Sequence, residues 1–135
     1  MPALKRLPAT RIVATPATLD GVVWPDEALV LRFAPDEVLV MPPLGSVPVS
    51  DPHAIIIADG GFAGVWLTAG EALAFLERAC EWEIPSGRPA FAQGSVAGIA
   101  TKIWFEEERV LFIVQAPYAH DFEERLSVIG ILPEV

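Results

Sequence analysis

Two adjacent carboxylates, Asp36 and Glu37, interrupt the apolar stretch LRFAPDEVLVMPP at residues 31–43. Paired carboxylates perform general acid and base chemistry when their surroundings separate their pKa values. They also occur at turns, where water solvates them. Pro35 presets the backbone angle that the second residue of a type I turn needs, and aspartate is tolerated at the third. We therefore interpret Asp36 and Glu37 as a turn between two strands rather than as a catalytic pair.

The other residues able to do chemistry are few and scattered. His53 and His120 lie far apart without cysteine neighbours, whereas zinc sites need three or four ligands at short spacing. The one cysteine, Cys80, falls on the apolar side of an expected helix and is interpreted as a small buried hydrophobe. No G-x-S-x-G motif occurs, and neither histidine has a nearby partner that would form a triad. The sequence therefore predicts no catalytic residue, no metal site and no cofactor bound by this chain.

The glycine-rich segment DGGFAG, residues 59–64, has two interpretations. A phosphate-binding glycine loop opens into a helix N-terminus, but this segment leads into the β-branched and aromatic pair Val65 and Trp66. An Asp-Gly pair instead favours a type I′ turn with positive φ at both positions. We expect a β-hairpin whose strands are HAIIIAD (53–59) and FAGVWLT (62–68).

Composition argues against several classes of function. The chain has 135 residues, 53% of them hydrophobic, which predicts a single domain over residues 1–135. Its formal net charge is −9 and its basic residues form no cluster, which argues against nucleic-acid binding. No apolar run reaches the ~18 residues that span a bilayer, and Arg11 interrupts the region that a signal peptide needs to be apolar. We expect a cytoplasmic protein that does not bind membranes.

Proline and glycine divide the chain into an α+β pattern. Residues 1–25 are proline-rich and predict an extended arm with one edge strand, and residues 28–130 predict the globular part. Beyond the hairpin described above, strands are expected at residues 28–33, 37–41, 96–105 and 109–116. A proline-rich loop is expected over residues 41–52 and a second loop over residues 85–94. The expected fold is a set of antiparallel hairpins with two flanking amphipathic helices.

Both helices are indicated by local signals. Thr68 and Glu71 have the spacing of a capping box, which predicts a helix over residues 69–81 with one apolar stripe. Phe75 lies beside this stripe and widens it, which suggests an additional contact surface. The second helix begins near Pro117, and its apolar residues recur at helical spacing up to Ile129.

Several of these segments resemble the gamma subunit of heterotetrameric sarcosine oxidase. LRFAPDEVLVMPP is similar to a strand, turn and strand near the start of that family, with an Ala-Pro-Asp-Glu turn, although Val38 stands where the family usually has tryptophan. The similarity extends over residues 28–128. It includes the segments AGEALAFLERACEWEI (69–84), FAQGSVAGIATKIWF (91–105) and LFIVQAPYAHDFEERL (111–126).

The resemblance implies a relative of the folate-binding fold also seen in the glycine cleavage T-protein. It further implies an accessory subunit of a flavin-dependent amine oxidase complex, with flavin and folate chemistry on partner chains. We therefore expect a non-catalytic accessory or interaction subunit that contacts other protein subunits or a second copy of itself. The alternative is a binding module for a folate-like small molecule, and an independent enzyme ranks third. Trp66, Phe75 and Trp104 are the candidate residues for an interface or for the wall of a ligand site.

Overall fold

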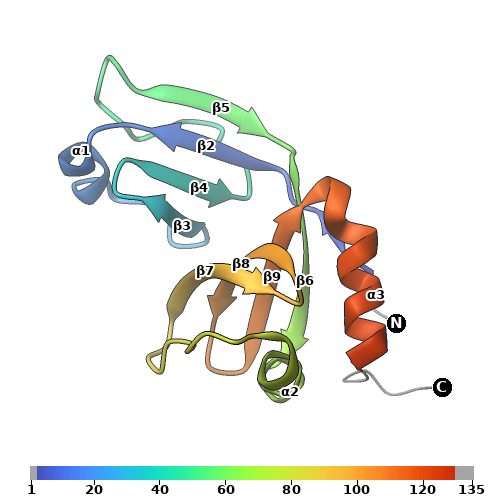
Figure 1. Ribbon diagram of the computed structural model, residues 1–135. Helices are drawn as coiled ribbons and strands as arrows, with labels where there is room; N and C mark the ends of the chain where they lie inside the picture. The colour runs from blue at the N-terminus through green and yellow to red at the C-terminus, as the bar shows by residue number, and fades with distance from the viewer. Residues whose placement is uncertain (1–2, 130–135) are drawn as a thin grey trace. The chain divides into compact units, whose positions relative to one another are not determined.

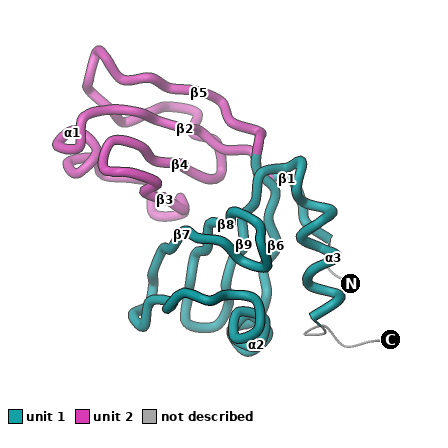
Figure 2. Tube along the Cα trace, in the orientation of Figure 1, with its two compact units in different colours: residues 1–6, 62–135 teal, residues 7–61 magenta. Residues whose placement is uncertain are grey.

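The computed structural model describes residues 3–129, and the chain divides into two compact units (Figure 2). Unit 1 comprises Met1–Arg6 and Phe62–Val135, and unit 2 comprises Leu7–Gly61. The chain therefore divides near residues 6 and 61, not at the boundary between an arm and a globular part that we expected near residues 25–28. Both units contain antiparallel strands and at least one helix, so the fold is α+β as predicted.

Unit 1 is a five-stranded antiparallel sheet with two helices (Figure 1). Its strands, in sheet order, are β1 (Lys5–Arg6), β6 (Phe62–Thr68), β9 (Arg109–Gln115), β8 (Ile99–Phe105) and β7 (Ala90–Val96). Helix α2 (Ala69–Ala79) follows β6, and the short 3₁₀ helix η1 (Ala116–Tyr118) leads from β9 into α3 (Ala119–Ile129). Both helices contribute to the core on one face of the sheet.

The start of α2 confirms the predicted capping box. The Thr68 hydroxyl accepts a hydrogen bond from the Glu71 backbone N–H at 3.2 Å, and the Thr68 backbone N–H donates to Glu71 Oε1 at 3.0 Å. Each side chain thus satisfies a backbone donor that the first helical turn leaves unpaired. The helix ends at Cys80, which is half-buried and whose thiol donates to the Trp82 carbonyl oxygen at 3.3 Å. Cys80 is therefore less buried than we expected.

Unit 2 is a four-stranded antiparallel sheet with one short helix. Its strands, in sheet order, are β3 (Leu29–Ala34), β4 (Glu37–Met41), β2 (Ala9–Val13) and β5 (Ile55–Asp59), and its helix is α1 (Pro16–Asp20). Residues 1–25 contribute two strands: β1 lies at one edge of the unit 1 sheet, whereas β2, which carries the β-branched residues of this segment, lies between β4 and β5 and is not an edge strand. Ile12 explains this position, since it is fully buried and packs in one core cluster with Val38 and Val40.

The Pro35–Asp36 turn is confirmed. Strands β3 and β4 pair antiparallel, and Ala34 lies opposite Glu37, so Pro35 and Asp36 form the connection. The register shifts between Arg32 and Ala34, as in a β-bulge. The carboxylates at this position therefore lie where a hairpin changes direction.

The predicted hairpin around residues 59–61 is wrong. Strand β5 pairs with β2, whereas β6 pairs with β1 and β9, so the two strands belong to different sheets and residues 59–61 connect them. Asp59 determines the local conformation, because its Oδ1 accepts the Gly61 N–H at 2.8 Å and its Oδ2 lies 3.1 Å from Arg11 Nε. This side-chain turn does not require the positive φ values of a type I′ hairpin.

A type I′ turn does occur at Ala97 and Gly98, which we had placed within a strand. Ala97 has φ of 50° and Gly98 has φ of 81°, the positive values that this turn needs. The segment expected as one strand over residues 96–105 is therefore a turn followed by β8. Strand β7 pairs with β8 from Ala90 to Val96, and it occupies part of the segment that we expected to be a loop.

Among residues 3–129, no helix is long and apolar enough to cross a membrane.

Candidate interaction site

Trp66 and Trp104 lie on the same row of the unit 1 sheet. Leu111 of β9 is the cross-strand partner of both, through the β6·β9 pairing on one side and the β8·β9 pairing on the other. Because side chains alternate along a strand, these three residues project from the face opposite the one that packs against α2 and α3. The structure therefore brings two of the three candidate residues together on one surface.

Arg109 and Glu106 connect the two indole rings. The guanidinium carbon of Arg109 lies 3.8 Å from the centroid of the Trp66 ring, and Arg109 Nε lies 2.8 Å from Glu106 Oε1. Glu106 Oε2 accepts a hydrogen bond from Trp104 Nε1 at 2.9 Å. We call these four residues, Trp66, Arg109, Glu106 and Trp104, the tryptophan cluster.

The backbone holds the tryptophan cluster in place. Glu106 and Arg109 stand at the two ends of the turn between β8 and β9, and the Glu106 N–H donates to the Arg109 carbonyl oxygen at 2.9 Å. The Glu108 carbonyl oxygen accepts the N–H of Ala69, the first residue of α2, at 2.9 Å. The acidic turn between β8 and β9 is therefore anchored to a helix and carries part of the site.

The electrostatics of the tryptophan cluster centre on Glu106. Hydrogen bonds from Arg109, and then from Trp104, lower the pKa of the Glu106 carboxyl group, although burial acts in the opposite direction. The carboxylate is therefore ionised near neutral pH and is paired with Arg109. A carboxylate whose pKa is lowered is a weak base, so this arrangement favours binding over proton transfer.

The tryptophan cluster remains partly accessible. Trp66 is 36% exposed, and the side chain of Arg109 is 55% exposed. Trp104 is half-buried. An indole with a stacked guanidinium at the surface presents a wide apolar area, and Arg109 Nε and Trp104 Nε1 beside it are already paired with Glu106.

Phe75 is not part of this surface. Its side chain is fully buried, and its ring makes edge-to-face contacts with Phe112 and Phe122, each at a centroid separation of 5.7 Å. Phe75 thus joins α2, β9 and α3 in the core. Our expectation that Phe75 provides an additional contact surface is wrong. Helix α3 packs over this position of α2 and buries the ring.

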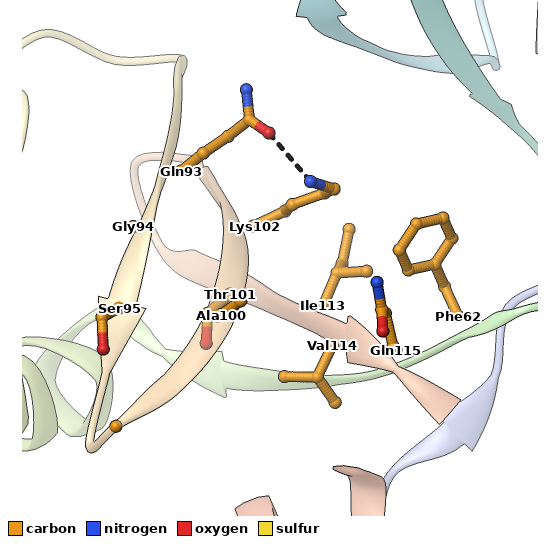
Figure 3. A pocket seen from close by; sticks show the side chains of 11 residues that line it. Phe62, Gln93, Gly94, Ser95, Ala100, Thr101, Lys102, Ile113, Val114 and Gln115 are labelled. Carbon is orange, nitrogen blue, oxygen red and sulfur yellow. Dashed lines mark hydrogen bonds between the residues drawn. The ribbon is translucent and has the colours of Figure 1, made fainter. Parts of the chain in front are cut away.

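A cavity of about 570 Å³ lies elsewhere on the unit 1 sheet (Figure 3). Strands β8 and β9 pair only from Phe105 to Lys102, and the cavity lies where they separate beyond this point. Lys102 Nζ donates to Gln93 Oε1 at 2.8 Å on its rim. Neither Trp66 nor Trp104 lines this cavity, so the tryptophans do not form its wall.

The tryptophan cluster belongs to unit 1, whereas Asp36 and His53 belong to unit 2. Cys80 stands at the C-terminal end of α2. Among residues 3–129, no three histidine, cysteine, aspartate or glutamate side chains gather in a way that could hold a metal ion.

Arg109 and Glu106 were not among the candidate residues from the sequence. The two residues are three positions apart across a predicted turn, and this spacing lets two side chains meet across a tight connection. The spacing is therefore the sequence signal that could have identified them.

Neither a protein-family model nor a curated protein matches this chain.

Proposed function

We propose that this chain is a non-catalytic accessory subunit that binds another protein through the tryptophan cluster. The observation that carries the proposal is the tryptophan cluster on an accessible sheet face. In this cluster Arg109 stacks on Trp66 and forms an ion pair with Glu106, which accepts a hydrogen bond from Trp104. Tryptophan and arginine are enriched among the residues that dominate binding energy at protein interfaces. Side chains that are already held in place lose less conformational freedom on binding.

The resemblance to sarcosine oxidase gamma supports a particular class of partner. On this proposal the partner is the catalytic chain of a flavin-dependent amine oxidase complex, and it presents an apolar pocket that accepts the Trp66 indole. The formal net charge of −9 favours a partner surface with an excess of basic residues around that pocket. The folate-like binding alternative is not favoured by the cavity, because neither tryptophan lines it.

The test is co-expression of the tagged chain with the catalytic flavoprotein chain of a sarcosine oxidase-type complex. We expect a stoichiometric complex that carries flavin absorbance, and we expect Trp66→Ala to weaken binding at least tenfold. The matched control is Leu73→Ala, which removes an exposed apolar side chain from α2 and should leave binding unchanged.

Two results would contradict the proposal. One is a chain that does not bind the flavoprotein chain but binds a folate analogue with micromolar affinity in calorimetry. The other is a complex whose affinity is the same for the wild-type chain and the folded Trp66→Ala variant. Circular dichroism establishes that the variant is folded.

A further inference from the structure

Strand β5 is an edge strand with three exposed isoleucines. The sheet order of unit 2 places β5 at one end, with β2 as its paired neighbour (Figure 1). Ile55, Ile56 and Ile57 are 55%, 49% and 48% exposed. Ile56 lies on the same face as its partner Ile12, and its two neighbours project from the opposite face. Apolar surface is therefore exposed on both faces of the same edge.

This edge lacks the features that usually prevent strands from pairing. Natural edge strands are protected by lysine, proline, bulges or short length. Residues 55–58 contain no charged residue and no proline, and the β2·β5 register runs without a shift from Ile55 to Asp59. The one charge in the strand, on Asp59, is paired with Arg11 at 3.1 Å. The edge thus presents backbone donors and acceptors beside uncharged β-branched side chains.

We propose that β5 pairs antiparallel with β5 of a second copy of this chain, with Ile56 on the two-fold axis. In this register Ile56 faces Ile56, and Ile55 of each copy faces Ile57 of the other, so every isoleucine meets an isoleucine. β-branched side chains are favoured in strands because they pack well against cross-strand neighbours. The two four-stranded sheets join into one continuous sheet, and the contact is self-complementary, as two-fold interfaces require.

Neighbouring registers match less well. If the axis passes through Ile57, Ile55 of one copy faces Asp59 of the other and Ile56 faces Ala58. If it passes through Ile55, Ile57 faces His53, which belongs to the preceding turn rather than to the strand. The isoleucine triplet therefore selects Ile56 as the centre and selects a second copy as the partner.

The contact is small, so the dimer is expected to depend on concentration. A single strand pair buries less than the ~1,200–2,000 Å² typical of stable interfaces, which suggests a dissociation constant on the order of micromolar or weaker. Each copy has a formal net charge of −9, and salt screens the repulsion between like charges. Dimerisation should therefore strengthen as the salt concentration rises.

Cysteine cross-linking tests the register directly. In a background with Cys80→Ser, which removes the one native thiol, Ile56→Cys places two thiols opposite each other. Under mild oxidation we expect a covalent dimer. Ile55→Cys is the matched control, because its two copies lie diagonally at ~7–8 Å, near or beyond the ~7 Å limit for a disulfide, and should cross-link several-fold less. The double variant Ile55→Cys/Ile57→Cys should restore cross-linking.

Light scattering and sedimentation of the full chain provide the second measurement. We expect a shift from monomer to dimer across the micromolar range, and a monomer at all these concentrations for Ile56→Lys. Val23→Lys is the control, since Val23 is an exposed apolar residue of unit 2 outside the strands, and it should still dimerise. Circular dichroism checks that each variant is folded.

Three results would overturn the proposal: a wild-type chain that stays monomeric, equal cross-linking by the two single cysteine variants, or a folded Ile56→Lys variant that still dimerises. The proposal is independent of the proposed function, because the tryptophan cluster lies in unit 1. Trp66→Ala should leave the dimer intact, so failure of one proposal does not imply failure of the other.

Discussion

The guanidinium group of Arg109 lies over the ring of Trp66, with its central carbon 3.8 Å from the ring centroid. Arg109 pairs with Thr68 in the sheet and Trp66 pairs with Leu111, so the two residues are diagonal neighbours on one face. Diagonal neighbours of this kind lie within reach of long side chains. The sheet register therefore brings the cation and the indole together, and the stacked pair is part of unit 1 before any partner binds.

Glu106 should make stability depend on pH. Its pKa lies below the ordinary value of 4.5, so its contribution to the free energy of unfolding is present above that value and is lost as the pH falls through the lowered pKa. Glu106→Gln should reduce the free energy of unfolding near neutral pH by less than about 1 kcal/mol, because the ion pair is exposed. Denaturant titrations well above and well below pH 4.5 measure this difference.

The matched control for this prediction is Glu107→Gln, which changes the neighbouring exposed carboxylate. The gap between the wild-type chain and Glu106→Gln should close at low pH, whereas Glu107→Gln should show little difference at either pH. A gap for Glu106→Gln that is equally large at both pH values would contradict the assignment.

Phe75 should matter for stability, whereas Leu73 on the same helix should not. Phe75 is fully buried against Phe112 and Phe122, and Leu73 is 45% exposed. Phe75→Ala should lower the free energy of unfolding by about 3–5 kcal/mol through lost burial and a cavity. Leu73→Ala should change it by less than about 1 kcal/mol. Equal effects in denaturant titrations would show that Phe75 is not a core residue in solution.

Features governed by neighbouring residues were predicted well from the sequence. The Thr68 and Glu71 capping box and the Pro35–Asp36 turn depend on residues within a few positions of one another, and the structure has both. The burial of Phe122 and Leu126 in α3 also follows from their helical spacing. Local signals of this kind suffice because the groups that satisfy each other lie on the same turn.

Features governed by distant partners were not predicted. Asp59 is held by Arg11, which lies in a different strand, so a segment typical of a hairpin instead connects two units. Phe75 is buried by Phe122, a residue of the last helix. Trp66 and Trp104 were identified as candidates, but their connection through Arg109 and Glu106 depends on the order of β6, β9 and β8 in the sheet.

Gly94 should tolerate no side chain. A Cβ atom at this position would lie 2.5 Å from Cε2 of Trp82, whose Nε1 donates to the Ser95 carbonyl oxygen at 2.8 Å. Gly94→Ala should therefore displace the indole and lower the free energy of unfolding by about 1–3 kcal/mol, the range for overpacked sites. Gly87→Ala is the control, because no atom lies within 4 Å of its added Cβ. Denaturant titration followed by tryptophan fluorescence compares the two, and equal stability would contradict the close packing.

The turn between β3 and β4 should depend on Arg32 more than on Asp36. Arg32 Nε donates to the carbonyl oxygens of Ala34 and Pro35 at 3.2 and 3.1 Å, and its Nη2 lies 3.0 Å from Asp20 Oδ1. These contacts hold the turn from one side and connect it to α1.

Asp36 contributes to the same turn through its backbone, because its carbonyl oxygen accepts the Ala14 N–H at 3.0 Å. Asp36→Asn keeps this bond and should change the free energy of unfolding by less than about 1 kcal/mol. Arg32→Ala removes several donors to carbonyl oxygens and should lower it by about 1.5–3 kcal/mol, the range for hydrogen bonds to charged groups. Denaturant titration of both variants compares the contributions of Arg32 and Asp36 to the turn. If Asp36→Asn left stability unchanged but reduced an assigned activity more than tenfold, Asp36 would have a chemical role in addition to its place in the turn.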